Sequence, residues 1–142
     1  MSLTNVRPYF RDRFDALGYA EWKDGFAIDN IPEQILDGSY HIAANSIVSR
    51  EITQNSIQLE SQVTTVLMFL GYRYPSEALD KAYEKLDAIY LEVMAPTNRL
   101  TTANGLRNVL LIDTNLEPLN LDNDNGILVT IRWKCHVEVC LV

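Results

Sequence analysis

Residue types that could support catalysis are sparse in this chain of 142 residues. Asp113 directly follows the apolar run Val109–Ile112, so it could stand at the end of a strand, where a metal-dependent nuclease places its acids. Such a site needs several acids near a lysine, and Asp113 is the sole candidate. We therefore expect no catalytic residues, and a nuclease-like enzyme is kept as an alternative.

The acidic segment Asp122–Gly126 superficially suggests a calcium loop, but its register excludes that function. An EF-hand loop has glycine at its sixth position, which here puts Leu121 first and Arg132 twelfth, where carboxylates are required. Asn-Gly before a strand is instead typical of a hairpin turn. We expect a polar turn, with Asp122 and Asp124 exposed.

Histidine and cysteine are equally rare: the chain has His41, His136, Cys135 and Cys140 and no others. No CxxC or HxxxH spacing accompanies them, and the six glycines form no phosphate-binding loop, so we expect no metal and no cofactor. If the two cysteines share a strand, they lie on opposite faces and roughly 16 Å apart, too far for a disulfide. We expect both to be reduced core residues.

Composition indicates one globular domain spanning residues 1–142. Hydrophobic residues make up 47% of the chain and charged residues 22%, which is close to the globular average. The net charge of −7 argues against phosphate binding as the main function, because nucleic-acid binders cluster lysine and arginine. No apolar segment approaches the ~18 residues of a membrane span, and we expect no secretory signal.

Two helices are expected from apolar residues that recur at helical spacing. The first spans Thr4–Leu17, with Thr4 as its N-cap and Gly18 as its stop. The second spans Ser76–Met94 and ends before Pro96. Its apolar stripe consists of Leu79, Ala82, Tyr83, Leu86, Ile89, Tyr90 and Val93.

Four runs are typical of strands. Ser39–Ile52 and Ile57–Tyr72 form a long hairpin, Val109–Ile112 is a short strand, and Ile127–Val142 alternates between apolar and polar residues. Val66–Leu70 is apolar on both faces, which predicts cover on both sides of the sheet. We expect an α+β fold: a mixed or antiparallel sheet of about four strands with a long projecting hairpin, packed by two main helices.

The hairpin strands are two to three times longer than the usual five or six residues. At ~3.3 Å per residue the hairpin extends roughly 45 Å, more than the ~30 Å diameter of a domain of this size. The outer part must project or bend, and we expect it to pack on a neighbouring subunit; a bent sheet within a monomer is the alternative. The expected interface consists of the apolar anchors Ile47, Ile52 and Ile57 and of Arg50, Glu51, Gln54 and Asn55 at the polar tip.

The order of elements over nearly the whole chain resembles the tail-terminator (tail-completion) proteins of long-tailed bacteriophages. The resemblance rests on an N-terminal helix that leads through the Gly25-Phe26 turn into the long hairpin, a second helix, and the turn Asp122–Gly126 before the closing strand. The chain departs from the family in the long polar stretch Thr97–Asn125.

The resemblance implies a structural protein of the virion tail or neck, assembled in the host cytoplasm without membrane contact. Such proteins form a ring, expected to be hexameric, that caps the tail tube, stops its polymerisation and joins it to the head-side connector. The implied partners are further copies of the chain, the tail tube protein and the head-tail connector protein, while DNA passes through without specific binding. Asp122 and Asp124 are possible channel-facing acids.

Three other interpretations stay open. A neck or head-completion protein of the same virion region shares the size and loosely shares the fold. A small cytoplasmic binding module would capture a peptide along an exposed sheet edge. A nuclease-like enzyme would depend on a metal and on Asp113.

Overall fold

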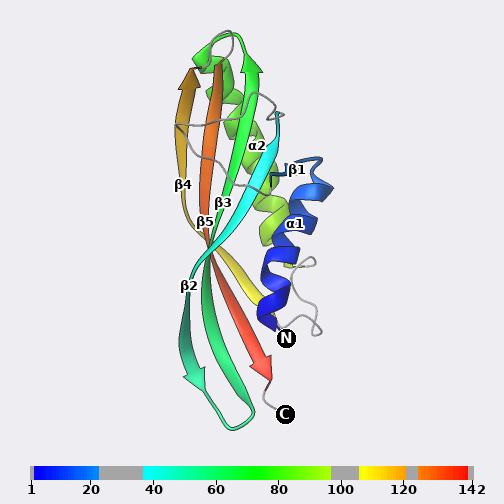
Figure 1. Ribbon diagram of the computed structural model, residues 1–142, viewed down its shortest axis with the longest axis vertical. Coiled ribbons are helices and arrows are strands. Elements are labelled where there is room, and N and C mark those ends of the chain that lie inside the picture. Colours follow the sequence, from blue (N-terminus) through cyan, green and yellow to red (C-terminus); the bar gives the residue numbers. More distant parts are fainter. Residues whose placement is uncertain (1, 23–36, 97–105, 121–124, 141–142) are drawn as a thin grey trace.

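A computed structural model describes residues 2–22, 37–96, 106–120 and 125–140. The fold is α+β, with two helices packed on one face of a mixed sheet (Figure 1). In chain order the elements are a 3-10 turn Ser2–Asn5, α1 Val6–Ala16, β1 Ala20–Glu21, β2 Ser39–Ile52, β3 Ser56–Tyr72, α2 Pro75–Met94, β4 Leu106–Asn120 and β5 Asn125–Cys140. We call the face of the sheet that carries the helices the helix side and the other face the open side.

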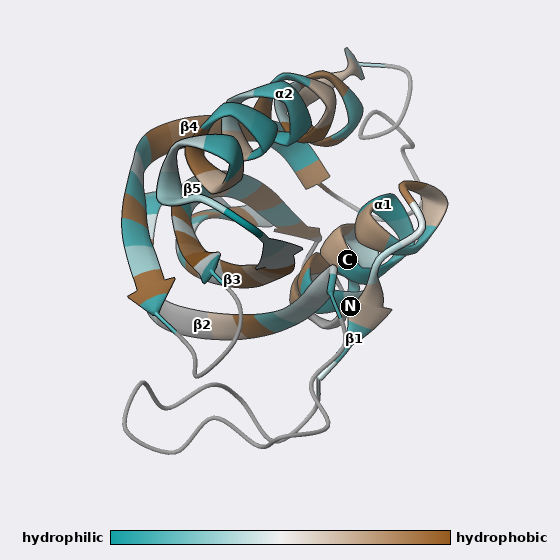
Figure 2. Cartoon of the chain, turned by 90° about the horizontal axis from the view of Figure 1, so that it is seen from above, coloured by the Kyte–Doolittle hydropathy of each residue, from teal (hydrophilic) through white to brown (hydrophobic). Residues whose placement is uncertain are grey.

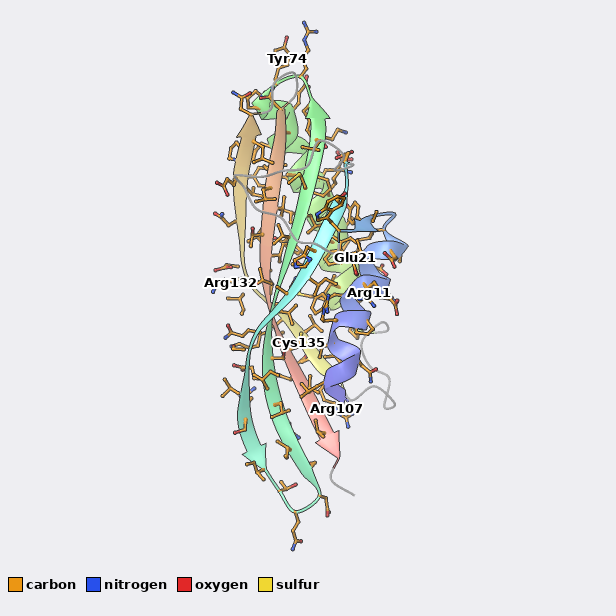
Figure 3. The ribbon with its side chains drawn as sticks, viewed as in Figure 1. Arg11, Glu21, Tyr74, Arg107, Arg132 and Cys135 are labelled. Carbon is orange, nitrogen blue, oxygen red and sulfur yellow. The ribbon has the colours of Figure 1, made fainter. Side chains whose placement is uncertain are left out.

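The described residues form one sheet of five strands in the order β1-β2-β3-β5-β4. The long strands β2, β3, β5 and β4 pair antiparallel in that order. The fifth strand, which the sequence did not predict, is short: Ala20 and Glu21 pair parallel with Ser39 and Tyr40. An ion pair of 2.7 Å between Arg11 Nε and Glu21 Oε2 holds this strand against α1 (Figure 3).

The sheet is strongly twisted along its length. In Figure 1 the left-to-right order of the strands reverses between the upper and the lower half. Right-handed strand twist accumulates over long strands, and β-bulges increase it. In β2 the register shifts by one residue between Ala44 and Ser46 and again between Ser49 and Glu51.

The core lies between the two helices and the helix side of the sheet. Trp133 of β5 is at its centre: its ring contacts Phe10 of α1 at 5.7 Å and Tyr90 of α2 at 6.2 Å between centroids. Its Nε1 donates a buried hydrogen bond of 2.9 Å to Thr65 Oγ1 on β3. One side chain therefore joins both helices to the middle of the sheet. The predicted alternation along β5 is confirmed by the buried side chains Ile127, Val129, Ile131, Trp133, Cys135 and Val137.

A second, smaller cluster covers part of the open side. Met68, Leu119 and Leu128 are buried there, and Trp22 packs against them from the chain after β1. Figure 2, a view down the long axis coloured by hydropathy, shows both helices together on the other side of the strands. The expectation that Val66–Leu70 is covered on both sides is confirmed.

The sequence underestimated β4. We expected a strand only over Val109–Ile112 inside the polar stretch, but β4 runs over Leu106–Asn120. It is an edge strand, so polar residues alternate with apolar ones, and Pro118 is tolerated because an edge position needs no outward donor. Pairing with β5, rather than local hydrophobicity, stabilises its second half.

The predicted helix ends are partly correct. Gly18 follows α1 with a φ of 88°, the left-handed conformation expected of a glycine stop. Thr4 is not the N-cap: it lies in the 3-10 turn, and Asn5 is the N-cap of α1. The second helix begins one residue earlier than predicted because Pro75 occupies its first turn, where no backbone donor is needed.

The Thr65–Trp133 hydrogen bond gives a stability prediction. Thr65→Val keeps the shape of the side chain but leaves the buried Trp133 Nε1 donor without its acceptor. We expect a loss of about 1–3 kcal/mol in the free energy of unfolding, measured by urea denaturation. Thr130→Val, on the open side of the neighbouring strand β5, is the control and should change stability by less than about 0.5 kcal/mol. Equal losses in both variants contradict the assignment.

Candidate functional site

Asp113, the one acid that suggested catalysis, is part of an ion pair. It lies inside β4 rather than at a strand end, directly opposite Arg132 of β5. Arg132 Nε donates to Asp113 Oδ1 at 2.7 Å, and Arg132 Nη2 donates to Asp113 Oδ2. The hydrogen bond from Arg132 lowers the pKa of the Asp113 carboxyl. In the part of the chain that the structure describes, no group of three or more His, Cys, Asp or Glu residues is placed to hold a metal.

This pair gives a testable pH dependence. The pKa of Asp113 is lowered in the folded state, so the stability from the pair is present above the ordinary carboxyl range and is lost as pH falls through the lowered pKa. In Arg132→Gln we expect the Asp113 carboxyl to titrate at a higher pH, as followed by NMR. Arg107→Gln, which changes another arginine of the sheet, should leave the titration of Asp113 unchanged. An unshifted titration in Arg132→Gln contradicts the pairing.

The other reactive groups have structural positions. Cys135 is free and buried on the helix side of β5, and burial raises the pKa of its thiol to about 12, so it is not a nucleophile near neutral pH. The prediction of a reduced core cysteine is confirmed for Cys135, whereas the side chain of Cys140 lies outside the described residues. His41 Nδ1 lies 3.0 Å from the Trp22 carbonyl oxygen.

Asp122 and Asp124, the possible channel-facing acids, lie outside the described residues. The strands on either side of them are described: Asn120 of β4 pairs with Asn125 of β5. Asn125 Nδ2 also donates to the Arg73 carbonyl oxygen at 2.8 Å, which fixes this end of the sheet against the start of α2. The exposure of the two acids stays a prediction.

The lower end of the sheet extends beyond the helices. In Figure 1 the hairpin of β2 and β3 continues past the start of α1. We call this part, residues 46–62 and the β5 residues beside them, the arm. The sequence predicted a hairpin, but β5 pairs with β3 as far as Ser56, which lies opposite Cys140. The outer end of the arm is therefore three strands wide, β4 joins β5 from Leu106 onwards, and the arm is stiffer than a free hairpin.

The helix side of the arm is apolar, and it is exposed along β2 but buried at Cys135 and Val137 of β5. Strand register places Ile47 opposite Ser61 and Ile52 opposite Ile57, which in turn pairs with Val139 of the core face. These side chains continue the row that the helices cover higher up. Ile47 is 54% exposed and Ile52 70% exposed, and Ile57 is half-buried.

The open side of the arm is charged. His136 Nε2 lies 2.8 Å from Arg50 Nη1 and 3.6 Å from Glu60 Oε1. Lys134 Nζ pairs with Glu60 Oε1 at 3.8 Å, and Arg107 Nε lies 3.4 Å from Glu138 Oε2 (Arg107 is labelled in Figure 3). Such exposed pairs contribute little to stability, but they keep this face hydrated.

The predicted interface residues thus divide between the two faces and the tip. Ile47, Ile52 and Ile57 share the helix side, and Glu51, Gln54 and Asn55 are exposed near the turn, as expected. Arg50 was predicted to lie at the tip; instead it is the extra residue of the second bulge, and its guanidinium group lies beside His136.

A second surface was missed by the sequence reasoning. An open cleft of about 420 Å³ lies between α2 and β4 on the helix side. Tyr90 of α2 reaches β4 here, with its hydroxyl 2.5 Å from Thr114 Oγ1. Tyr83 is 56% exposed at the cleft. The lining residues are Tyr83, Leu86, Asp87, Tyr90, Thr114 and Leu116.

The sequence did contain a signal for this cleft. The apolar stripe of α2 is wider than the face that packs on the sheet: Ala82, Ile89 and Val93 are buried, while Leu79 and Tyr83 at the margin stay exposed. A stripe wider than the core face of a helix indicates a second contact.

The comparisons with known proteins assign no family: no protein-family model matches the chain, and no curated protein matches its sequence. Among the described helices, none is both long and apolar enough to cross a membrane. The interpretation therefore rests on the geometry of the arm and the cleft.

Proposed function

We propose that this chain is a structural subunit of a bacteriophage virion, and that copies of it assemble into a ring, expected to be hexameric, that caps the tail tube. The ring would stop tube polymerisation and join the tube to the head-side connector. Its partners would be the tail tube protein and the connector protein, with DNA passing through the centre. The chain would act in the tail or neck after assembly in the host cytoplasm.

The exposed apolar face of the arm is the observation that carries this proposal. Ile47 and Ile52 lie on the same face as the core, yet α1 and α2 do not extend over them. Exposed apolar side chains on a rigid projecting element indicate a protein partner. When such a contact joins unlike surfaces of identical subunits and the rotation closes, the product is a ring. The element order of the chain, which resembles tail terminators, supports the same proposal.

A second candidate function is a module that binds an extended peptide. After Tyr40, the outer edge of β2 has no partner strand among the described residues, and neither has the outer edge of β4. An open edge can accept a peptide as an additional strand. This function requires no self-assembly, so the mass of the protein in solution distinguishes it from the ring.

Light scattering over a range of protein and salt concentrations tests the ring. We expect a species near six times the subunit mass of 16.2 kDa and, by electron microscopy, particles with a central hole. Added to growing tubes of the tail tube protein encoded by the same genome, the ring should shorten them. Tubes of unchanged length contradict the terminator function.

Deletion of residues 50–56 tests the role of the arm. Ser49 pairs with Leu59, so the deletion leaves Ile57 and Gln58 as a two-residue turn between strands that stay paired. We expect a folded monomer, because the deleted residues contribute nothing to the buried core. Circular dichroism and urea denaturation check the fold, and light scattering checks the mass. An oligomer of wild-type mass contradicts the assignment of the arm.

A further inference from the structure

The arm and the cleft are two apolar surfaces on the same side of one sheet. Ile47 and Ile52 belong to β2 and lie on the helix side. The cleft lies on the helix side as well, and Leu111 of β4, which pairs with the core residue Trp133, is partly exposed on the same strand that lines it. Each surface has apolar side chains that the described residues leave uncovered.

These two surfaces cannot meet within one chain. In the strand order β2 and β4 lie on opposite sides of the central pair β3 and β5, and the arm is at the lower end of the sheet while α2 covers the upper part (Figure 1). A second copy of the chain, however, carries the complementary surface. The contact would join unlike patches, and such contacts form a ring when the rotation between successive copies closes.

Strand direction favours copies in the same orientation. Three successive antiparallel pairings make β2 run opposite to β4. Two copies side by side in the same orientation therefore bring β2 of one against β4 of the next as an antiparallel pair. A two-fold dimer whose axis is perpendicular to the strands would place the same strands parallel, and parallel pairing is slightly less stable per residue.

We propose that the arm of one copy docks at the α2–β4 edge of a second copy, with β2 alongside β4. Ile47 is level with Val109 and lies below the cleft, so the second copy is shifted along the strands until Ile47 lies in the cleft beside Tyr83 and Ile52 lies beside Leu111. When β2 continues the sheet of the neighbour next to β4, the helix side of the arm lies on the same side of the sheet as the helix side of the neighbour. The charged open side with Arg50 and Glu60 stays in water. This docking rests on the self-assembly proposed above and specifies which surface receives the arm.

The small area of the contact indicates why a single contact is weak and why closing a ring would stabilise the assembly. Residues 46–52 of β2 extend about 23 Å, and one strand is about 4.8 Å wide, so the docked strip measures about 110 Å². A standard interface buries about 800 Å² on each partner. A single docked arm is therefore a weak contact, whereas each subunit of a closed ring makes two such contacts and the ring is stabilised accordingly.

Ile47→Asp and Val48→Asp form a matched pair for the test. The two residues are adjacent and equally exposed, at 54% and 53%, but Val48 pairs with Glu60 on the open side. We expect Ile47→Asp to reduce the mass by light scattering to 16.2 kDa and Val48→Asp to keep the wild-type mass. An oligomer that survives Ile47→Asp and is lost in Val48→Asp overturns the proposed face of the arm.

Complementation between two variants identifies the receiving surface. Tyr83→Asp places a charge in the cleft at an exposed position, so the variant should fold but remain monomeric. When the two variants are mixed, Tyr83→Asp supplies an intact arm and Ile47→Asp supplies an intact cleft. We expect a weak pair of one copy of each by sedimentation, with no larger species. If Tyr83→Asp forms an oligomer of the same mass as the wild-type protein, docking in the cleft is overturned, but the proposal of a ring is not.

The mass of the wild-type protein in solution distinguishes a failure of this docking from a failure of the proposed function. A particle of only two copies that both Ile47→Asp and Tyr83→Asp dissociate supports the docking and overturns the ring. A wild-type monomer at every concentration overturns the docking, while the tube-length assay still decides the terminator function.

Discussion

The structure depends on a mismatch between the length of its helices and that of its strands. A helix rises about 1.5 Å per residue and a strand about 3.3 Å. The 20 residues of α2 therefore span about 30 Å, whereas the 17 residues of β3 span about 56 Å. Two helices cannot cover a sheet of this length, so part of its apolar face extends beyond them.

This mismatch in length decides which part of the sheet is covered by helices and which part is exposed. Where the helices cover the sheet, Trp133 joins α1, α2 and the strands, and the core side chains are buried. Along β2 in the arm, the alternation of residues continues without a helix above it, which leaves Ile47 and Ile52 exposed. An apolar face on a stiff, three-stranded element is better suited to binding another protein than to holding a small reactant. The pairing of Asp113 with Arg132 and the burial of Cys135 are consistent with that interpretation.

The sequence predicted the parts of the fold that depend on local pattern. Helical spacing located α1 and α2, and alternation located β2, β3 and β5 with ends correct to within two residues. It missed most of β4, because the second half of that strand has a polar face and is stabilised by its pairing with β5. It also missed the cleft, whose walls come from two elements that no local pattern relates.

By itself, the sequence determined the α+β class, the excess strand length and the exposed apolar residues of the arm, because composition and periodicity act over a few neighbouring residues. The tertiary structure decided which face each residue occupies. Two bulges shift the register of β2, and they turn Arg50 towards His136 rather than the tip. Only the strand order places β2 and β4 at opposite edges, since pairing between distant segments follows from the packing of the whole sheet.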